Sequence, residues 1–176
     1  QDYVLRLARD KARAVAALQG DAKTIISADT TVVDDGEILG KPHDAADAER
    51  MLRQLRGHTH QVYTGMALLS SDGRLLSELG FTDVPMRSYT DEEMAAYVAS
   101  DDPLDKAGAY AIQHEGFHPV ENMQGCYANV VGLPLCHLVR SLRKIGLEPK
   151  ENVAEQCQEA FKYSCPVYDL ILREEI

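Results

Sequence analysis

An aspartate inside a run of small and β-branched residues constrains this chain more than any other feature. Asp29 lies within residues 27–33, and the pattern around it predicts a largely buried strand over residues 23–34. A buried carboxylate is costly to desolvate unless a partner compensates its charge. Asp35-Gly36 is a strong hairpin signal, and the returning chain reaches Gly40-Lys41-Pro42. An acid on a strand, with a lysine returned beside it, indicates a site that binds phosphate and metal and activates water.

Composition and charge narrow the class of protein. The chain has 176 residues, of which 45% are hydrophobic and 26% charged, as expected for one globular domain with a proper core. No apolar run approaches the roughly 18 residues that a membrane helix needs. The net charge of −10 argues against a nucleic-acid polymer as partner, but it leaves room for a small anion in a local basic cleft.

The cysteine spacing matches no zinc-ribbon or CxxC pattern. The four cysteines are Cys126, Cys136, Cys157 and Cys165. This spacing favours free thiols in a reducing cytosol over a structural disulfide or a metal site. We therefore expect a cytoplasmic protein.

Helical periodicity, caps and turn signals predict alternating helices and strands. The expected helices cover residues 3–18, residues 44–56, a segment after the Thr90–Glu93 capping box, a segment from Pro134 to about Ile145, and roughly residues 150–163. The expected strands cover residues 23–34, 59–70, 74–88, 107–113 and 117–121. This order fits a mixed α/β or α+β domain.

A few residue types stand out as candidates for chemistry. Asp29 suits a base near an attacking water or a ligand for a divalent cation; the alternative is a strand-end aspartate that caps a turn. Lys11, Lys41 and Lys106 lie in or beside tight local signals and suit phosphate oxygens, although each could be an ordinary surface lysine. The amide of Gln113 could read the edge of a base, or simply end a strand.

The histidines and one loop offer weaker candidates. His58 and His60 alternate on a predicted strand, and His114 and His118 are four residues apart, but neither pair has a third ligand at a convincing spacing. A generic α/β domain with a histidine metal site is therefore a third interpretation. Residues 127–135 resemble a loop that enters a helix, where backbone N–H groups could take an anion or the helix could merely pack.

Seven short segments occur in a fixed order between roughly residues 3 and 146. They are residues 7–13, 28–30, 36–42, 63–65, 97–100, 103–110 and 129–135. Together they resemble the Maf (septum-formation inhibitor-like) family of nucleoside triphosphate pyrophosphatases. The resemblance implies a bilobal α/β fold similar to the inosine triphosphatase-like enzymes: a mixed twisted sheet with flanking helices and the nucleotide in the cleft between lobes. It covers a Maf-like domain over residues 1–147, and residues 148–176 form a partly helical tail of unknown role.

The resemblance also implies an activity: hydrolysis between the α- and β-phosphates, with release of the monophosphate and pyrophosphate. Asp29 matches the catalytic acceptor and, with lower weight, a ligand for Mg²⁺ or Mn²⁺. Lys41 matches a catalytic cation, and Lys11 and Lys106 match phosphate-binding lysines. An alternative is a catalytically weak nucleotide-binding or interaction module linked to septum formation in cell division. A homodimer is expected only by analogy.

Two positions separate the branches of the family. Thr30 and Gln113 carry the pair that the dTTP/UTP branch has, whereas the 7-methyl-GTP branch has Gln and Glu there. The resemblance therefore implies dTTP and UTP as substrates, with modified pyrimidine nucleotides as possible further ones. Ala111 and His114 depart from the glycines that usually flank this glutamine and add bulk beside it.

The family also begins with a strand and a Ser-x-Ser-Pro-Arg-Arg loop that cradles phosphates. This sequence, which starts at Gln1, contains no such segment. Three explanations stay open: the chain is a fragment, those residues are missing only from the sequence given, or the protein lacks that part of the site.

Overall fold

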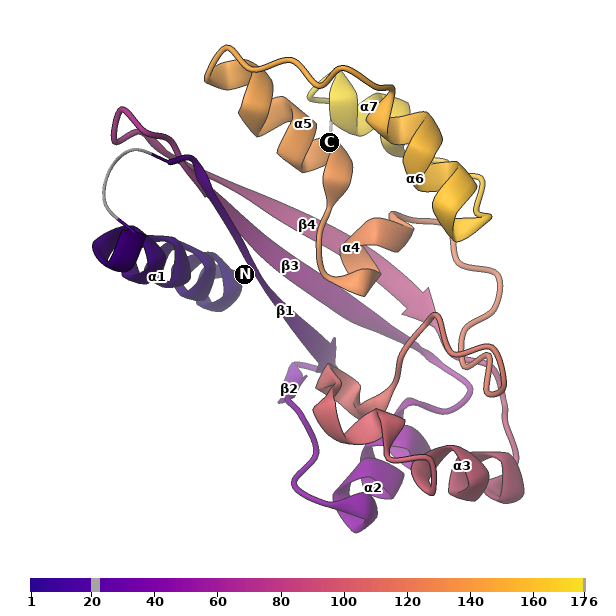
Figure 1. Ribbon diagram of the computed structural model, residues 1–176. Coiled ribbons are helices and arrows are strands. Elements are labelled where there is room, and N and C mark those ends of the chain that lie inside the picture. The colour runs from indigo at the N-terminus through magenta and orange to yellow at the C-terminus, as the bar shows by residue number, and fades with distance from the viewer. Residues whose placement is uncertain (20–22, 176) are drawn as a thin grey trace. The chain divides into compact units, whose positions relative to one another are not determined.

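A computed structural model describes residues 1–19 and 23–175 (Figure 1). Its described residues form a mixed α/β fold with seven α-helices, four strands and two short 3₁₀ helices. The helices are α1 (Asp2–Gln19), α2 (Ala45–Leu55), α3 (Asp91–Val98), α4 (Tyr127–Val131), α5 (Leu135–Lys144), α6 (Val153–Phe161) and α7 (Tyr168–Leu172). The strands are β1 (Ile25–Asp34), β2 (Glu37–Leu39), β3 (Thr59–Leu69) and β4 (Leu75–Pro85), and the 3₁₀ helices are η1 (Asp102–Asp105) and η2 (Ala107–Ala109).

The described strands form one sheet in the order β2-β1-β3-β4. β1 and β2 pair antiparallel, with Val32 opposite Leu39. The turn between them has positive φ at both central residues, 46° at Asp35 and 84° at Gly36. Such a turn matches the right-handed twist of two paired strands, and Asp-Gly is one of the few pairs that adopt it easily. The predicted hairpin is therefore confirmed.

The chain divides into two compact units. The first contains Gln1–Thr30, Tyr63–Thr82 and Gly125–Ile176, and the second contains Thr31–Val62 and Asp83–Gln124. Each long strand therefore has residues in both units. None of the described helices is long and apolar enough to cross a membrane.

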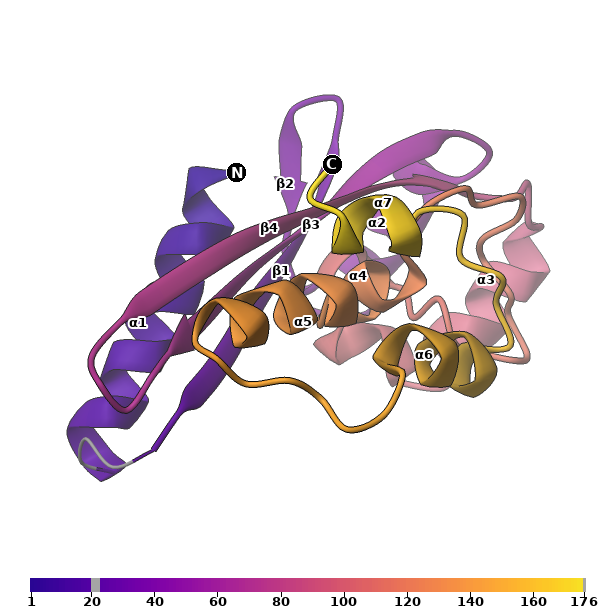
Figure 2. The same ribbon diagram turned by 90° about the horizontal axis from the view of Figure 1, so that it is seen from above.

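In the first unit, α1 covers one face of the sheet and helices α4 to α7 cover the other (Figures 1 and 2). Gly65 of β3 faces α1 so closely that a Cβ there would lie 2.5 Å from the carbonyl of Val4. Its neighbour Thr64 faces the opposite way and donates a hydrogen bond to the Asn129 carbonyl of α4 at 2.8 Å. Successive strand residues point to opposite faces, so this one strand fixes both layers.

The C-terminal segment packs within the first unit. Its apolar cluster joins buried residues from four parts of the chain, namely Cys126, Ala128, Cys136, Ala154 and Ile171. α6 lies within the predicted helix over residues 150–163, whereas α7 is not predicted because five residues are too short for periodicity to register. The boundary at residue 147 stays a prediction, and residues on either side of it share this cluster.

The second unit contains the helices whose caps the sequence predicts best. Asp44 accepts a hydrogen bond from the Asp47 amide and starts α2, whose inward face is buried. Thr90 and Glu93 form the reciprocal capping box that starts α3. Such caps satisfy amide groups that a helix start otherwise leaves unpaired, which is why the two helices begin where the sequence predicts.

Two predicted strands of the second unit are wrong. Residues 107–113 form the 3₁₀ helix η2 and a turn, and around Val120 only an isolated bridge to Met86 forms. The cause is a close approach at Gly108, whose φ is 69° and whose amide donates to the Gly40 carbonyl at 3.0 Å. A Cβ at Gly108 would lie 3.0 Å from the side chain of Val32, so only glycine fits this contact easily.

Candidate functional site

Asp29 lies on β1 in the first unit and is paired with a lysine from α1. The Nζ atom of Lys11 is 2.6 Å from Oδ1 of Asp29 and 3.1 Å from the carbonyl oxygen of Ala28. The aspartate side chain is 17% exposed and the lysine side chain 53% exposed. The ion pair offsets the cost of desolvating the Asp29 carboxylate, because that group has a charged partner and remains partly accessible to solvent.

The packing of α1 on β1 creates this pair. Val4, Ala8 and Ala12 form the buried face of α1. The Ser27 hydroxyl donates to the Ala8 carbonyl at 2.6 Å, which fixes the helix along the strand. Lys11 lies at the edge of the buried face and reaches the strand two residues beyond Ser27. The sequence identifies both members as candidates but does not predict that they pair with each other.

Thr30 follows Asp29 and belongs to a chain of hydroxyl groups. Its Oγ1 lies 2.9 Å from Oγ1 of Thr64, which itself donates to the Asn129 carbonyl. A hydroxyl has one proton, so Thr64 must accept from Thr30. The oxygen of Thr30 therefore keeps its lone pairs for another donor. Gly132 leaves space beside this oxygen: any larger residue would place its Cβ 3.2 Å from Oγ1 of Thr30.

The second unit brings two of the candidate lysines into one neighbourhood. The hydrogen bond from Gly108 to Gly40 joins the segment that carries Lys106 to the segment that carries Lys41. Asp105 is influenced by both lysines: its hydrogen bond with Lys106 lowers its pKa below the ordinary value, and the charge of Lys41 adds to the effect. Both lysines therefore act on the same small region of the surface.

Lys106 is not free in this structure. It makes a short ion pair with Asp105 and a longer one with Asp102, whose carboxylate lies 3.7 Å away. The hydrogen bond that Lys106 donates to Asp105 raises the pKa of Lys106 above its ordinary value, so the side chain stays charged. A phosphate group would have to compete for this cation with the exposed carboxylate of Asp105 and the partly exposed carboxylate of Asp102. Ion pairs near the surface are weak, so this competition costs little free energy.

Tyr97 of α3 organises the loop that carries Lys106 and Gln113, a role that the sequence does not reveal. Its hydroxyl donates to Asp102 at 2.7 Å and accepts from the amide of Ala111 at 3.0 Å. Its ring stacks on Phe117, with centroids 4.3 Å apart. Burial raises the pKa of Tyr97 far above its ordinary value, so the hydroxyl remains a donor. One side chain thus fixes both ends of the loop.

Gln113 lies in the turn after Ala111, and its side chain is exposed. The His114 ring accepts a hydrogen bond from the Phe117 amide at 3.0 Å and contacts the ring of Tyr97. The extra bulk that the sequence places beside Gln113 is therefore directed into the loop, and the amide is left accessible.

The histidines serve local contacts. His60 is fully buried and shares a hydrogen bond of 2.8 Å with Tyr110, and burial lowers its pKa to about 4. His58 pairs with the buried carboxylate of Asp34 at 2.9 Å. Over residues 1–19 and 23–175, no three His, Cys, Asp or Glu side chains lie where they could hold a metal ion together. The histidine metal site thus has no support in this part of the chain.

Comparison with known proteins identifies the family. A model described as "Maf-like protein" matches residues 1–145. The dTTP/UTP pyrophosphatase of Geobacter sulfurreducens is 52% identical over 147 residues, which cover 82% of this chain and 76% of that protein. The dTTP/UTP pyrophosphatase of Escherichia coli strain K12 is 53% identical over 135 residues, which cover 77% of this chain and 68% of that protein. The chain belongs to the Maf family, as the seven segments predict.

Proposed function

We propose that this chain is a nucleotide pyrophosphatase that hydrolyses dTTP and UTP to the monophosphate and pyrophosphate. The two relatives described above, which are named dTTP/UTP pyrophosphatase, share 52% and 53% of aligned residues with this chain. The observation that carries the proposal is the pairing of Asp29 with Lys11 at 2.6 Å on a strand of the first unit. A partly exposed carboxylate with a fixed cation beside it suits proton abstraction next to a phosphate group.

In the proposed reaction, Asp29 accepts a proton from the attacking water. Lys11 occupies Oδ1, so Oδ2 is the oxygen directed to the water. The water oxygen forms a bond to the α-phosphorus, and the bond from that phosphorus to the bridging oxygen breaks. Pyrophosphate leaves with the electron pair. The ammonium of Lys11 faces the same carboxylate and stabilises negative charge that develops on the phosphoryl oxygens.

Lys41 and Lys106 of the second unit are the proposed cations for the other phosphates. Lysine is a compact charge with three donors, which suits oxygens whose positions change during reaction. Lys106 exchanges Asp105 and Asp102 for phosphate oxygens when substrate binds. Lys41 is exposed in the connecting segment before Pro42 and meets phosphate without such an exchange.

A divalent cation, Mg²⁺ or Mn²⁺, is the proposed cofactor. Mg²⁺ is usually held by one or two carboxylates together with substrate phosphates rather than by an all-protein cage. Asp29 as the protein's carboxylate fits that pattern, and so does the lack of any larger ligand group among the described residues. When bound, the cation neutralises phosphate charge and acidifies water.

Thr30 and Gln113 are the proposed selectivity residues. Thr30 has an oxygen that accepts, and the Gln113 amide both donates and accepts, so each suits a polar group on the edge of a pyrimidine base. We further propose that the protein acts in the cytoplasm as a homodimer. Light scattering of the purified chain tests the dimer.

The decisive experiment measures pyrophosphate release with Mg²⁺ from dTTP, UTP, CTP, GTP, 7-methyl-GTP and ATP. We expect turnover of dTTP and UTP well above the others. Nucleotide binding by folded protein without release of pyrophosphate would contradict the proposal. That result would favour the alternative, a nucleotide-binding module linked to cell division.

A further inference from the structure

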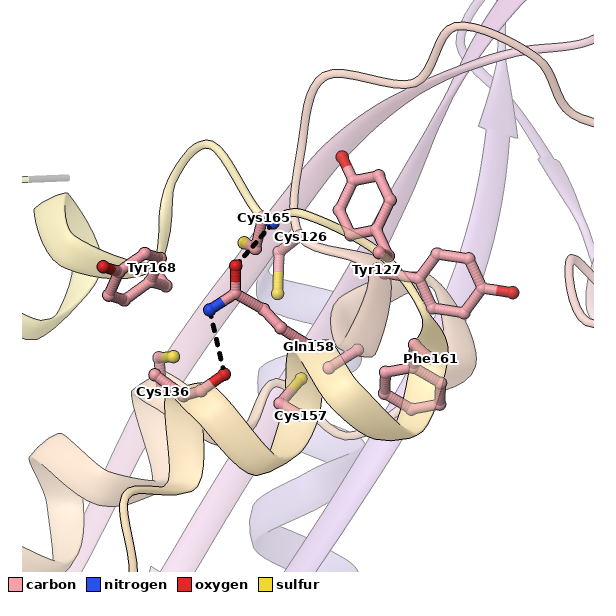
Figure 3. A pocket seen from close by; sticks show the side chains of 11 residues that line it. Cys126, Tyr127, Cys136, Cys157, Gln158, Phe161, Cys165 and Tyr168 are labelled. Carbon is pink, nitrogen blue, oxygen red and sulfur yellow. Dashed lines mark hydrogen bonds between the residues drawn. The ribbon is translucent and has the colours of Figure 1, made fainter.

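The four cysteines, which are spread over forty residues of the sequence, line one pocket of the first unit (Figure 3). Aromatic residues complete the wall, namely Tyr127, Phe161, Tyr163 and Tyr168. Two of the thiols come from the family-matched part of the chain and two from the C-terminal segment beyond residue 145. All four are free thiols in this structure, so the pocket gathers reducing groups in an apolar setting.

The thiols differ in how easily a reagent reaches them. Cys126 and Cys136 are buried, with 6% and 5% of their surfaces exposed, whereas Cys157 and Cys165 are half-buried. Burial raises the pKa of Cys126 to about 11 and that of Cys136 to about 12. These two are therefore poor targets for a reagent from solvent, because the thiolate is the reactive form.

Hydrogen bonds tie the chain around Cys165 to the chain around Cys126. The Tyr163 hydroxyl donates to the carbonyl of Gly125 at 3.0 Å and accepts from its amide at 3.3 Å. The side chain of Gln158 accepts from the Cys165 amide at 3.0 Å, which holds that residue over α6. Figure 3 draws the four thiols around one pocket, and among the other cysteines Cys165 has the largest electrostatic effect on the pKa of Cys126. Two thiols with different access to solvent thus line the same pocket, on chain segments that hydrogen bonds tie together.

We propose that Cys165 and Cys126 are a thiol–disulfide exchange site that reacts with low-molecular-weight disulfides. The half-buried Cys165, as thiolate, attacks one sulfur of the small disulfide, and its S–S bond breaks to release one small thiolate. Cys126 then loses its proton and attacks the Cys165 sulfur of the mixed disulfide. The second small thiolate leaves and the Cys126–Cys165 bond forms. Two protein thiols are oxidised, one small disulfide is reduced to two thiols, and the two protons end on those thiols.

The bond would connect two parts of the protein that now meet only through packing and hydrogen bonds. Cys126 precedes the first residue of α4, and Cys165 lies in the segment between α6 and α7. Cross-links that close a long loop restrict the unfolded chain, so the oxidised protein should be more resistant to unfolding. The disulfide would thus attach the C-terminal segment covalently to the part of the chain that matches the family, and only under oxidising conditions.

The first test exposes the full folded chain to oxidised glutathione, blocks the remaining thiols and maps disulfides by mass spectrometry. We expect one intramolecular disulfide, between Cys126 and Cys165, that dithiothreitol reverses. A bond between Cys157 and Cys165, or four thiols that all remain free, would overturn the proposal.

In a second measurement without variants, brief alkylation of the reduced native chain should label Cys165 before Cys126. Equal labelling would contradict the assigned order.

Matched variants separate the two roles. Cys126→Ser should accumulate a stable glutathione adduct on Cys165, because the resolving thiol is gone. Cys165→Ser should leave Cys126 as a free thiol under the same treatment. Cys136→Ser, from the same pocket wall, is the control and should still form the Cys126–Cys165 disulfide. Circular dichroism spectra that match the wild type confirm that each variant is folded, and a persistent disulfide partner for Cys126 in Cys165→Ser would refute the pairing.

Discussion

The two groups of candidate residues are built in different ways. In the first unit, Asp29 and Lys11 stand on a strand and a helix and already form an ion pair. In the second unit, Lys41 and Lys106 lie in connecting segments outside the helices and strands, where Gly108 and Tyr97 fix the backbone; these two lysines are the turn-borne group. The difference indicates that the groups proposed to move a proton are held on regular elements. The groups proposed to bind phosphates stand where they can exchange partners.

The largest effect should follow from changing the strand-borne acid. Asp29→Asn removes the proton acceptor but keeps the shape of the side chain, so kcat should fall by about 10²–10⁴-fold. Asp10→Asn changes an exposed acid on α1 that pairs with Arg13; it is the matched control and should retain full activity. Steady-state pyrophosphate release checks both. A rate for Asp29→Asn near that of the wild type would remove Asp29 from the reaction.

A turn-borne lysine should matter next. Lys41→Ala removes a cation that the proposal directs to a phosphate group, and the loss of one such stabilising group costs about 10²-fold in rate. Lys150→Ala removes an exposed lysine from the C-terminal segment and serves as control. Measurement of kcat/KM for dTTP compares the two. If both variants behave alike, the second unit has no part in binding phosphate and the contrast between the units disappears.

The sequence predicts the strand-borne group well because its signals are local. Periodicity locates α1, and the Asp35-Gly36 turn locates the hairpin after Asp29. The pairing of Lys11 with Asp29 is not local: it depends on how α1 packs on β1, which the Ser27–Ala8 hydrogen bond sets. Sequence patterns therefore identify the candidates but not their contacts.

The turn-borne group resists prediction for a different reason. Residues 107–113 are apolar enough to predict a strand, but Gly108 has a positive φ and contacts Val32 and Gly40. Val32 lies 76 residues and Gly40 68 residues earlier in the chain, so no local pattern reveals these contacts. Tyr97 is missed likewise, since an aromatic residue on a helix usually signals only a core position.

Acidification should lower the stability of both units by the same mechanism, whereas each substitution above affects one unit. His60 in the second unit and His137 in the first are buried, and burial lowers the pKa of each to about 4. The unfolded chain binds a proton at each histidine near pH 6.5, whereas the folded chain does so only near pH 4. The free energy of unfolding is therefore highest above pH 6.5, where these histidines are neutral in both states. The stabilisation is lost as the pH falls from 6.5 towards 4, by up to about 3 kcal/mol for each histidine.

Urea unfolding at pH values between 7.5 and 4.5 measures this loss. NMR titration of the imidazole Cε1 protons assigns it to the two histidines separately. A free energy of unfolding that stays constant between pH 6.5 and 4.5 would contradict the effect. Loss confined to one histidine would show that the units differ in acid stability as well as in their site residues.

Tyr97→Phe tests whether a tyrosine fixes the turn-borne group. The variant keeps the ring that stacks on Phe117 but deprives Asp102 and the amide of Ala111 of their partner. The loss of hydrogen bonds of this kind costs about 1–2 kcal/mol, so KM for dTTP should rise about tenfold while kcat changes little. Tyr163→Phe, which loses hydroxyl contacts to Gly125 in the first unit, is the control and should leave KM unchanged. A fall in kcat at constant KM would contradict a positioning role.

Gln113→Glu should give the smallest effect and the most selective one. The proposed amide donates to a pyrimidine carbonyl oxygen, whereas a carboxylate only accepts and repels that oxygen. One lost hydrogen bond corresponds to about fivefold, so kcat/KM should fall by about that factor for dTTP and UTP. GTP should lose less, because the N–H groups on the edge of guanine can donate to a carboxylate. Gln156→Glu on α6 adds the same charge at an exposed position and serves as control.

Equal losses for all nucleotides would show that the added charge repels the triphosphate and that position 113 reads no base. Selectivity would then depend on Thr30 in the first unit, and the division of labour between the two units would reverse.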